Sequence, residues 1–163
     1  MFYFSEKHDL AVAQIPKAGL TSIRYWLGHD FSVVKNDVAR AASRRVAFIR
    51  HPLERLRSCY SFMCWHSEAG YVPRSAAPLN SWTTFVDHIL SVKPDEHWLP
   101  QSVHVGDVPN IIRRFETINQ CYHEFFGGTL PHRNPVIRLE TNDYREADLM
   151  EFYKDDMALW SAA

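Results

Sequence analysis

The sequence has few cysteines, and they do not suggest a disulfide framework. Its 163 residues include three, an odd number, and none forms a Cys-x-x-Cys pair. Small secreted domains depend on many paired cysteines, and zinc sites need cysteines or histidines at close, regular spacing. We therefore expect reduced thiols, a cytoplasmic location and no metal site. The three cysteines are Cys59, Cys64 and Cys121.

Long apolar runs and a strong net charge are also missing. No stretch approaches the ~20 apolar residues of a membrane-spanning helix, and the first residues lack the pattern of a signal peptide. A formal net charge of −1 gives no overall attraction to nucleic acid or to an acidic membrane. We expect no targeting segment, no membrane span and no nucleic-acid partner. The length fits one domain over residues 1–163.

Arginine, in contrast, is concentrated in one part of the chain. Six arginines lie within residues 40–57, and six carboxylates lie within residues 143–156. A basic segment in a nearly neutral protein indicates a local anion site. For any single arginine, however, a place on a solvated helix face is the commoner role.

Short apolar runs alternate with helical patterns along the sequence. Strands are predicted over residues 9–15, 31–34, 45–49 and 111–115. Helices are predicted over residues 21–27, 52–65, 81–93, 118–126 and 148–160, with a short one starting at residue 36 or 37. Residues 94–110 are expected to be irregular, with a short extended piece around residue 103. The alternation predicts an α/β fold with a central parallel sheet flanked by helices.

Ligands of such sheets bind at the carboxyl ends of the strands. The loop after the first predicted strand reads IPKAGLTS over residues 15–22. Gly19 lets backbone amides approach an anion, and the following helix adds free N–H groups and the positive end of its dipole. Lys17, Thr21 and Ser22 add a charge and two hydroxyls. A phosphate-binding loop and a plain strand-to-helix turn explain this segment equally well, and the Walker A pattern is absent.

A second motif, RHPLERLRS, covers residues 50–58. Arg50 ends a predicted strand and Pro52 begins a helix, so Arg50 is expected beside the first loop. Its guanidinium offers paired donors that suit a phosphate, and Ser58 can add a hydroxyl two helical turns later. By itself, an arginine that caps the carbonyls of the sheet is the commoner interpretation.

Together, the two motifs resemble the sulfotransferase superfamily, especially its carbohydrate-type branch, which includes heparan sulfate 2-O- and chondroitin sulfotransferases. That family has a P-K-x-G-x-T-S loop after its first strand and an R-[DH]-P-x-x-R-x-x-S motif on a later strand and helix. The similarity extends in order over nearly the whole chain. Weaker pieces of it are HWLPQ at residues 97–101, RFE at 114–116, LPHRN at 130–134 and YKDD at 153–156.

The resemblance implies a three-layer P-loop-type fold and the transfer of a sulfuryl group from 3′-phosphoadenosine 5′-phosphosulfate (PAPS) to a hydroxyl, with saccharides as one acceptor class. The product nucleotide would be 3′-phosphoadenosine 5′-phosphate (PAP). Arg50 and Ser58 would hold the 3′-phosphate, Phe115 would lie near the adenine, and Arg133 would belong to a segment that closes over the nucleotide. The 5′ end of the donor would be held by Lys17, Ala18, Gly19, Leu20, Thr21 and Ser22. Many family members have a hydroxyl residue at the position of Leu20, so one phosphate contact is missing here.

The resemblance also implies an in-line displacement in which Lys17 stabilises charge on the leaving phosphate oxygen. The acceptor then needs a general base within hydrogen-bond reach. The segment between the loop and Arg50 often supplies that base, and it is shorter here than in the eukaryotic enzymes. Three candidates stay open: His97 in the irregular segment, His29 before the second predicted strand, and Asp37 after it. The alternative for His97 is a histidine that orders its loop, and the commoner role for Asp37 is a helix N-cap. The position of His29 before the second strand, rather than after it, is an argument against it.

The acceptor pocket is expected to be shaped by residues 64–80 and 94–104. Four aromatic residues there could stack on sugar rings or belong to the core, namely Trp65, Tyr71, Trp82 and Trp98. For Trp82, which lies on a predicted helix, the core is favoured. Two other functions are compatible with the motifs. One is a non-catalytic nucleotide-binding protein of the same fold, and the other is a P-loop-type kinase. The missing Walker A pattern and the lack of an evident Mg²⁺-binding carboxylate disfavour the kinase.

Overall fold

The computed structural model describes residues 1–68, 80–92, 94–128 and 139–163. Within these residues, five strands form one sheet in the order β3-β1-β2-β4-β5. The strands are β1 (Phe2–Ser5), β2 (Leu10–Ala13), β3 (Ser32–Val34), β4 (Arg44–Ile49) and β5 (Ile111–Arg114). β2, β4 and β5 are parallel, whereas β1 is antiparallel to both of its neighbours, β2 and β3.

The expected purely parallel sheet is therefore wrong at β1, a strand that the sequence patterns did not predict. β1 and β2 are joined by the four residues 6–9, which is enough for a hairpin but far too short for the crossover that a parallel pair needs. Asp9 closes this turn in the left-handed region, at φ 46°. The carboxyl ends of β2 and β4 still lie side by side, as the predicted site requires.

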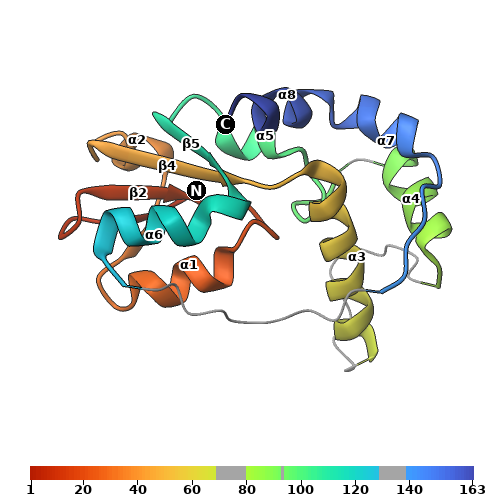
Figure 1. Ribbon diagram of the computed structural model, residues 1–163, viewed down its shortest axis with the longest axis horizontal. Helices are drawn as coiled ribbons and strands as arrows, with labels where there is room; N and C mark the ends of the chain where they lie inside the picture. The colour runs from red at the N-terminus through yellow and green to blue at the C-terminus, as the bar shows by residue number, and fades with distance from the viewer. Residues whose placement is uncertain (69–79, 93, 129–138) are drawn as a thin grey trace.

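Helices cover both faces of the sheet, so the α/β class is confirmed (Figure 1). Side chains of β2 and β4 alternate between the two faces. Leu10, Val12, Val46 and Phe48 pack with helices α1 (Leu20–Leu27) and α6 (Ile118–Phe126). Ala11, Ala13, Ala47 and Ile49 pack on the opposite side with α2 (Asn36–Ala39), α5 (Gln101–Val105) and α8 (Lys154–Ala162).

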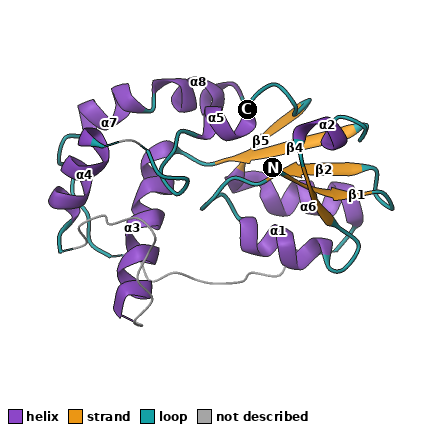
Figure 2. Ribbon diagram, turned by 180° about the vertical axis from the view of Figure 1, so that it is seen from behind, coloured by secondary structure: helices purple, strands orange, loops and turns teal. Residues whose placement is uncertain are grey.

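A second core lies beyond the carboxyl end of β4. It is built by helices α3 (Pro52–Glu68), α4 (Trp82–Ser91) and α7 (Glu146–Phe152) (Figure 2). The predicted N-cap of α4 is confirmed, because Ser81 Oγ accepts a hydrogen bond from the amide of Thr84 over 3.1 Å. α3 leads from the end of β4 into this core, so its first turns lie beside the sheet edge where the site was predicted.

Two further expectations are corrected. Residues 94–110 are not irregular throughout, because they contain α5, whose first amides donate to the carboxylate of Asp156, 2.8 Å from the nitrogen atoms of Gln101 and Ser102. The last predicted helix is two helices, α7 and α8, which meet at Tyr153. The buried Tyr153 donates to the carbonyl of Trp98 over 2.6 Å. Both features depend on contacts about 55 residues apart in sequence, which local patterns do not encode.

The other predicted strands and helices are confirmed to within a few residues. A short 3-10 helix, η1 (Phe115–Thr117), follows β5, and α6 ends at Gly127 as predicted. No helix in the described ranges is long and apolar enough to cross a membrane.

Candidate functional site

The loop between β2 and α1 has a strained backbone and is closed on one side by an aromatic ring. Lys17 and Gly19 have φ angles of 65° and 81°, in the left-handed region. A Cβ atom at Gly19 would lie 2.6 Å from Cε2 of Phe115, so a larger residue would displace that ring. Glycine is therefore required at position 19 for two reasons, the left-handed backbone angle and the close contact with the Phe115 ring. Phe115 is packed against the loop, where the predicted nucleotide site lies.

Arg50 lies beside this loop, as predicted. Its Nη1 donates a long hydrogen bond of 3.5 Å to the carbonyl oxygen of Lys17, and its guanidinium lies 5.3 Å from the centroid of the Phe115 ring. Gln101 holds the backbone of Arg50 from both sides, accepting from its amide over 2.9 Å and donating to its carbonyl over 2.8 Å. The two predicted motifs thus meet at one place.

A second arginine of the same motif, Arg55, ties the loop to the turn before α5. Its side chain is only 1% exposed. The guanidinium donates to the carbonyl oxygens of Pro16 (2.8 Å), Leu99 (2.9 Å) and His97 (3.2 Å). Sequence reasoning gave Arg55 no role, although the P-x-x-R-x-x-S part of the motif includes it. The turn that carries His97 is consequently held next to the loop that carries Lys17.

The ammonium group of Lys17 is partly withdrawn from water. Its Nζ lies 3.6 Å from the centroid of the Phe62 ring on α3. Burial lowers the pKa of Lys17 to about 8, and repulsion from Arg50 and Arg55 acts in the same direction. Three cationic side chains therefore gather at the carboxyl end of β2, and the charge on Lys17 is disfavoured until a negative group joins them.

His97 is the candidate base that the structure brings closest to the loop. Its ring stacks on Phe62, with centroids 6.5 Å apart and planes inclined by 24°. Its Nδ1 lies 2.7 Å from Oδ1 of Asp95. His97 and Lys17 therefore contact the same aromatic ring, and a carboxylate orients the imidazole.

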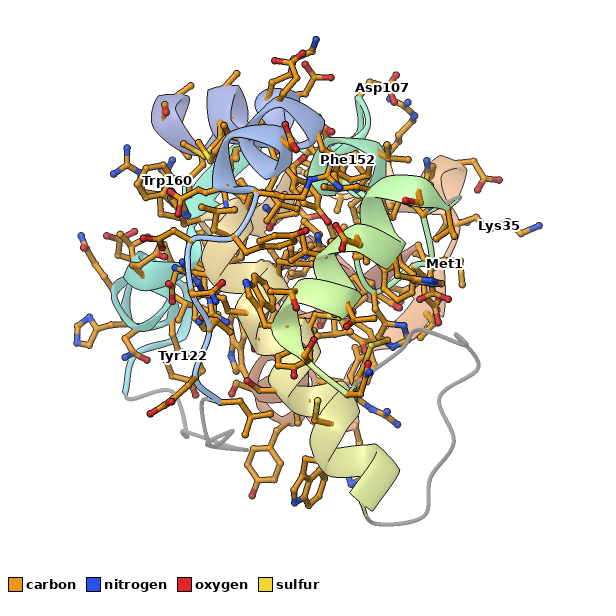
Figure 3. The ribbon with its side chains drawn as sticks, turned by 90° about the vertical axis from the view of Figure 1, so that its right-hand side faces the viewer. Met1, Lys35, Asp107, Tyr122, Phe152 and Trp160 are labelled. Carbon is orange, nitrogen blue, oxygen red and sulfur yellow. The ribbon has the colours of Figure 1, made fainter. Side chains whose placement is uncertain are left out.

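The other two candidate bases lie elsewhere. α1 spans eight residues, about 12 Å, so His29 beyond its far end is well separated from Lys17. The next residue, Asp30, pairs with Lys7 of the β1–β2 turn over 2.7 Å, at the opposite edge of the sheet. Asp37 is exposed on α2, which follows β3, two strands away from β2. Figure 3 shows Lys35, which precedes α2, on the opposite side of the molecule from Trp160. The structure brings neither His29 nor Asp37 to the loop.

His51 contacts the C-terminal helix α8. Its ring packs edge-on against Trp160 of α8, at 4.9 Å between centroids. The guanidinium of Arg114 lies over the same indole ring, 4.3 Å from its centroid. These contacts dock α8 against the ends of β4 and β5, where the C-terminal helix borders the site (Figure 1).

Ser58 lines a hollow of about 340 Å³ on α3. Glu54 lies between two guanidinium groups at one end of it, 3.9 Å from Nη2 of Arg50 and 3.1 Å from Nη1 of Arg57. Nε of Arg57 is buried and has no hydrogen-bond partner among the residues that the structure describes. Sequence reasoning did not assign Arg57 to the site. The remaining lining residues are Ser61, Leu139 and Thr141.

The other predicted donor-site residues differ in what they can offer. The amide of Ala18 donates to the carbonyl of Ile15 over 3.2 Å, so the turn itself uses this donor, and its side chain is buried. Leu20 packs against the α1–α6 side of the core. Thr21 is exposed and Ser22 half-buried in the first turn of α1, which has no side-chain cap. Arg133 lies outside the described residues.

Two of the four aromatic residues considered for the acceptor belong to the core instead. Trp82 is 6% and Trp98 2% exposed, and both pack in the α3–α4–α7 cluster. Trp65 is 58% exposed at the end of α3. Tyr71 lies outside the described residues. No group of three or more histidine, cysteine or carboxylate side chains in the described ranges could hold a metal ion.

No model of a protein family matches this chain. Searches of curated proteins and of solved structures likewise find no match. The two sequence motifs, and the geometry that joins them at Lys17 and Arg50, are therefore the basis on which a function is assigned.

Proposed function

We propose that this chain binds PAPS and transfers its sulfuryl group to a hydroxyl acceptor, for which a saccharide is one candidate class. The observation that carries the proposal is the cationic cluster of the buried Arg55 and the partly buried Lys17 and Arg50 at the end of β2. Burial and mutual repulsion already lower the pKa of Lys17 in this cluster. A phosphate-rich ligand would relieve that repulsion, so the site favours an anion over a neutral ligand.

The residues around the loop fit such a ligand at both of its ends. Lys17 and the first amides of α1 supply a charge and free N–H donors for the 5′ end. Ser58 lines the hollow on α3, and Arg50, which precedes that helix, lies 3.9 Å from the lining residue Glu54, so both are proposed to hold the 3′-phosphate. Arg57 has a buried Nε without a partner among the described residues in that hollow, a donor that a phosphate oxygen could accept. A strand–loop–helix of this kind, at the carboxyl ends of the adjacent parallel strands β2 and β4, also suits a three-layer P-loop-type fold.

When bound, PAPS would supply an activated sulfuryl group on a phosphate leaving group. Lys17 is proposed to neutralise the charge that develops on the leaving oxygen, because its ammonium lies at the loop. Because the pKa of Lys17 is lowered to about 8, added negative charge raises the fraction of Lys17 that is protonated near neutral to mildly basic pH. His97 is proposed to take up the proton of the acceptor hydroxyl at Nε2, since its Nδ1 is held by Asp95.

The proposal is tested by incubating the protein with radiolabelled PAPS and a panel of hydroxyl acceptors that includes saccharides. We expect label transfer by the wild-type chain and its loss in Lys17→Met. The matched control, Lys35→Met, removes an exposed lysine on the far side of the molecule and should keep full activity (Figure 3).

Other results would point to other functions. Tight binding of PAP without any transfer would support a non-catalytic nucleotide-binding protein. Stabilisation by Mg²⁺-ATP but not by PAP would support a kinase. Equal transfer by the wild-type chain and Lys17→Met would remove Lys17 from the proposed role.

A further inference from the structure

Asp95 and His97 form a carboxylate–imidazole pair next to the loop. Oδ1 of Asp95 lies 2.7 Å from Nδ1 of His97 and also accepts from the backbone amide of His97 over 3.0 Å. An ionised carboxylate can only accept hydrogen bonds, so Nδ1 must carry the proton of this contact. In the neutral imidazole, Nε2 is then the nitrogen with a free lone pair.

The pair is held rigidly from both sides. The amides of Trp98 and Leu99 donate to the carbonyl of Asp95 over 3.1 and 2.7 Å, which closes a tight turn around the carboxylate. Arg55 then binds the carbonyls of His97 and Leu99 from within the core. The imidazole is therefore fixed in position as well as in tautomer, and its ring lies against Phe62, the ring that Lys17 also contacts.

From this geometry we infer that Asp95 is a positioning residue, which holds His97 in the Nδ1–H tautomer so that Nε2 can accept the proton of the acceptor hydroxyl. The inference rests on the proposed function for the identity of that hydroxyl. A turn alone would need only the bond to the backbone amide. The same oxygen also accepts a hydrogen bond from the imidazole ring. A turn does not need this second bond, whereas a general base needs it to keep its other nitrogen unprotonated.

The tautomer can be observed directly, whether or not the protein turns over PAPS. Two-bond ¹H–¹⁵N spectra of the full chain, recorded at a pH where the imidazole is neutral, should show His97 protonated at Nδ1 and unprotonated at Nε2. Asp95→Ala should shift His97 toward the Nε2–H form. If that variant fails to fold, Asp95→Ser serves, because its hydroxyl oxygen can still accept from the backbone amide while it no longer offers a carboxylate to the ring. An Nε2–H ring in the wild-type protein, or a tautomer that Asp95 variants leave unchanged, would overturn the inference.

Kinetics then separate this inference from the proposed function. We expect Asp95→Asn to lower kcat by about 10- to 100-fold, within the range that general-base catalysis contributes, while the Kd for PAP changes less than twofold. Asp107→Asn, which removes an exposed carboxylate paired with Arg40, should change neither. If the wild-type protein transfers sulfuryl groups and His97→Gln abolishes transfer but Asp95→Asn does not, the positioning role is wrong and the proposed function stands. If no variant or wild-type protein transfers, the proposed function fails and the tautomer alone decides the role of Asp95.

Discussion

Arg55 donates a 2.8 Å hydrogen bond from Nε to the carbonyl oxygen of Pro16, although the two residues are 39 positions apart in sequence. Pro16 immediately precedes Lys17, so this bond fixes the base of the candidate phosphate-binding loop. The other two nitrogens of the same guanidinium bind the turn that carries His97. One buried charge therefore determines how the candidate charge-stabilising residue and the candidate base face each other.

Arg55→Lys should show how much the three hydrogen bonds of the guanidinium contribute apart from its positive charge. Lysine keeps the positive charge but lacks the planar set of donors that reaches three carbonyls. We expect the free energy of unfolding to fall by about 2–4 kcal/mol, because buried carbonyls lose charged partners. Urea unfolding provides the measurement, and Arg113→Lys on the exposed part of β5 is the control. A loss below about 0.5 kcal/mol in Arg55→Lys would show that the three bonds matter little.

Lys17→Met should make the protein more stable while it removes anion binding. The pKa of Lys17 falls from 10.5 to about 8 in the fold, so folding disfavours the charged form at every pH below about 8. That penalty fades as the pH rises from about 8 to 10.5. Methionine keeps the apolar contact with Phe62 and carries no charge. Its upper limit of stabilisation at pH 7 is about 3 kcal/mol, from about 1.4 kcal/mol per pKa unit. A less stable Lys17→Met protein would contradict this account.

The affinity for PAP should weaken as the pH rises above about 8. The free protein loses the Lys17 proton around that pH, whereas the complex retains it because the ligand is negative. We expect the Kd to rise by up to about tenfold per pH unit until the pKa of the complex is reached. Calorimetric titrations between pH 6.5 and 9.5 measure this directly. In Lys17→Met the same titrations should give a weak Kd with little pH dependence over that range.

Much of this arrangement was accessible from the sequence. The strand-loop-helix around Gly19 and the strand-helix junction at Arg50 follow from local patterns, and parallel neighbours bring such junctions to one sheet edge. β1 was missed because four residues next to a tight turn carry too little periodicity to be distinguished from a loop. The α/β class could thus be predicted, but not the mixed order of the strands.

The site was harder to predict wherever long-range contacts decide it. From the sequence, His29, Asp37 and His97 all stayed open as candidate bases. The structure separates them, because α1 carries the chain away from the loop whereas Arg55 pulls the turn around His97 toward it. The sequence already favoured the core for Trp82, on a predicted helix, and the structure confirms it. Trp98 offered the same aromatic chemistry as Trp65, and packing against neighbouring helices assigns it to the core.

Glu54→Gln should strengthen PAP binding. The carboxylate of Glu54 lies between Arg50 and Arg57, and it competes with a 3′-phosphate for the same guanidinium groups. Removing its charge while keeping its shape should lower the Kd for PAP by about 3- to 10-fold, equivalent to about 0.7–1.4 kcal/mol. Glu151→Gln, on the exposed surface of α7, is the matched control. Weaker PAP binding in Glu54→Gln would instead mean that Glu54 orients the arginines for the ligand.

The central claim is that Lys17 and Arg50 bind one nucleotide carrying phosphates at both ends. It is tested most directly by calorimetric titration of the wild-type protein and Arg50→Ala with PAP and with adenosine 5′-phosphate. We predict that the wild-type protein prefers PAP by at least tenfold, and that Arg50→Ala removes most of this preference with little effect on adenosine 5′-phosphate. Equal affinities of the wild-type protein for the two nucleotides, or equal losses for both in Arg50→Ala, would contradict it.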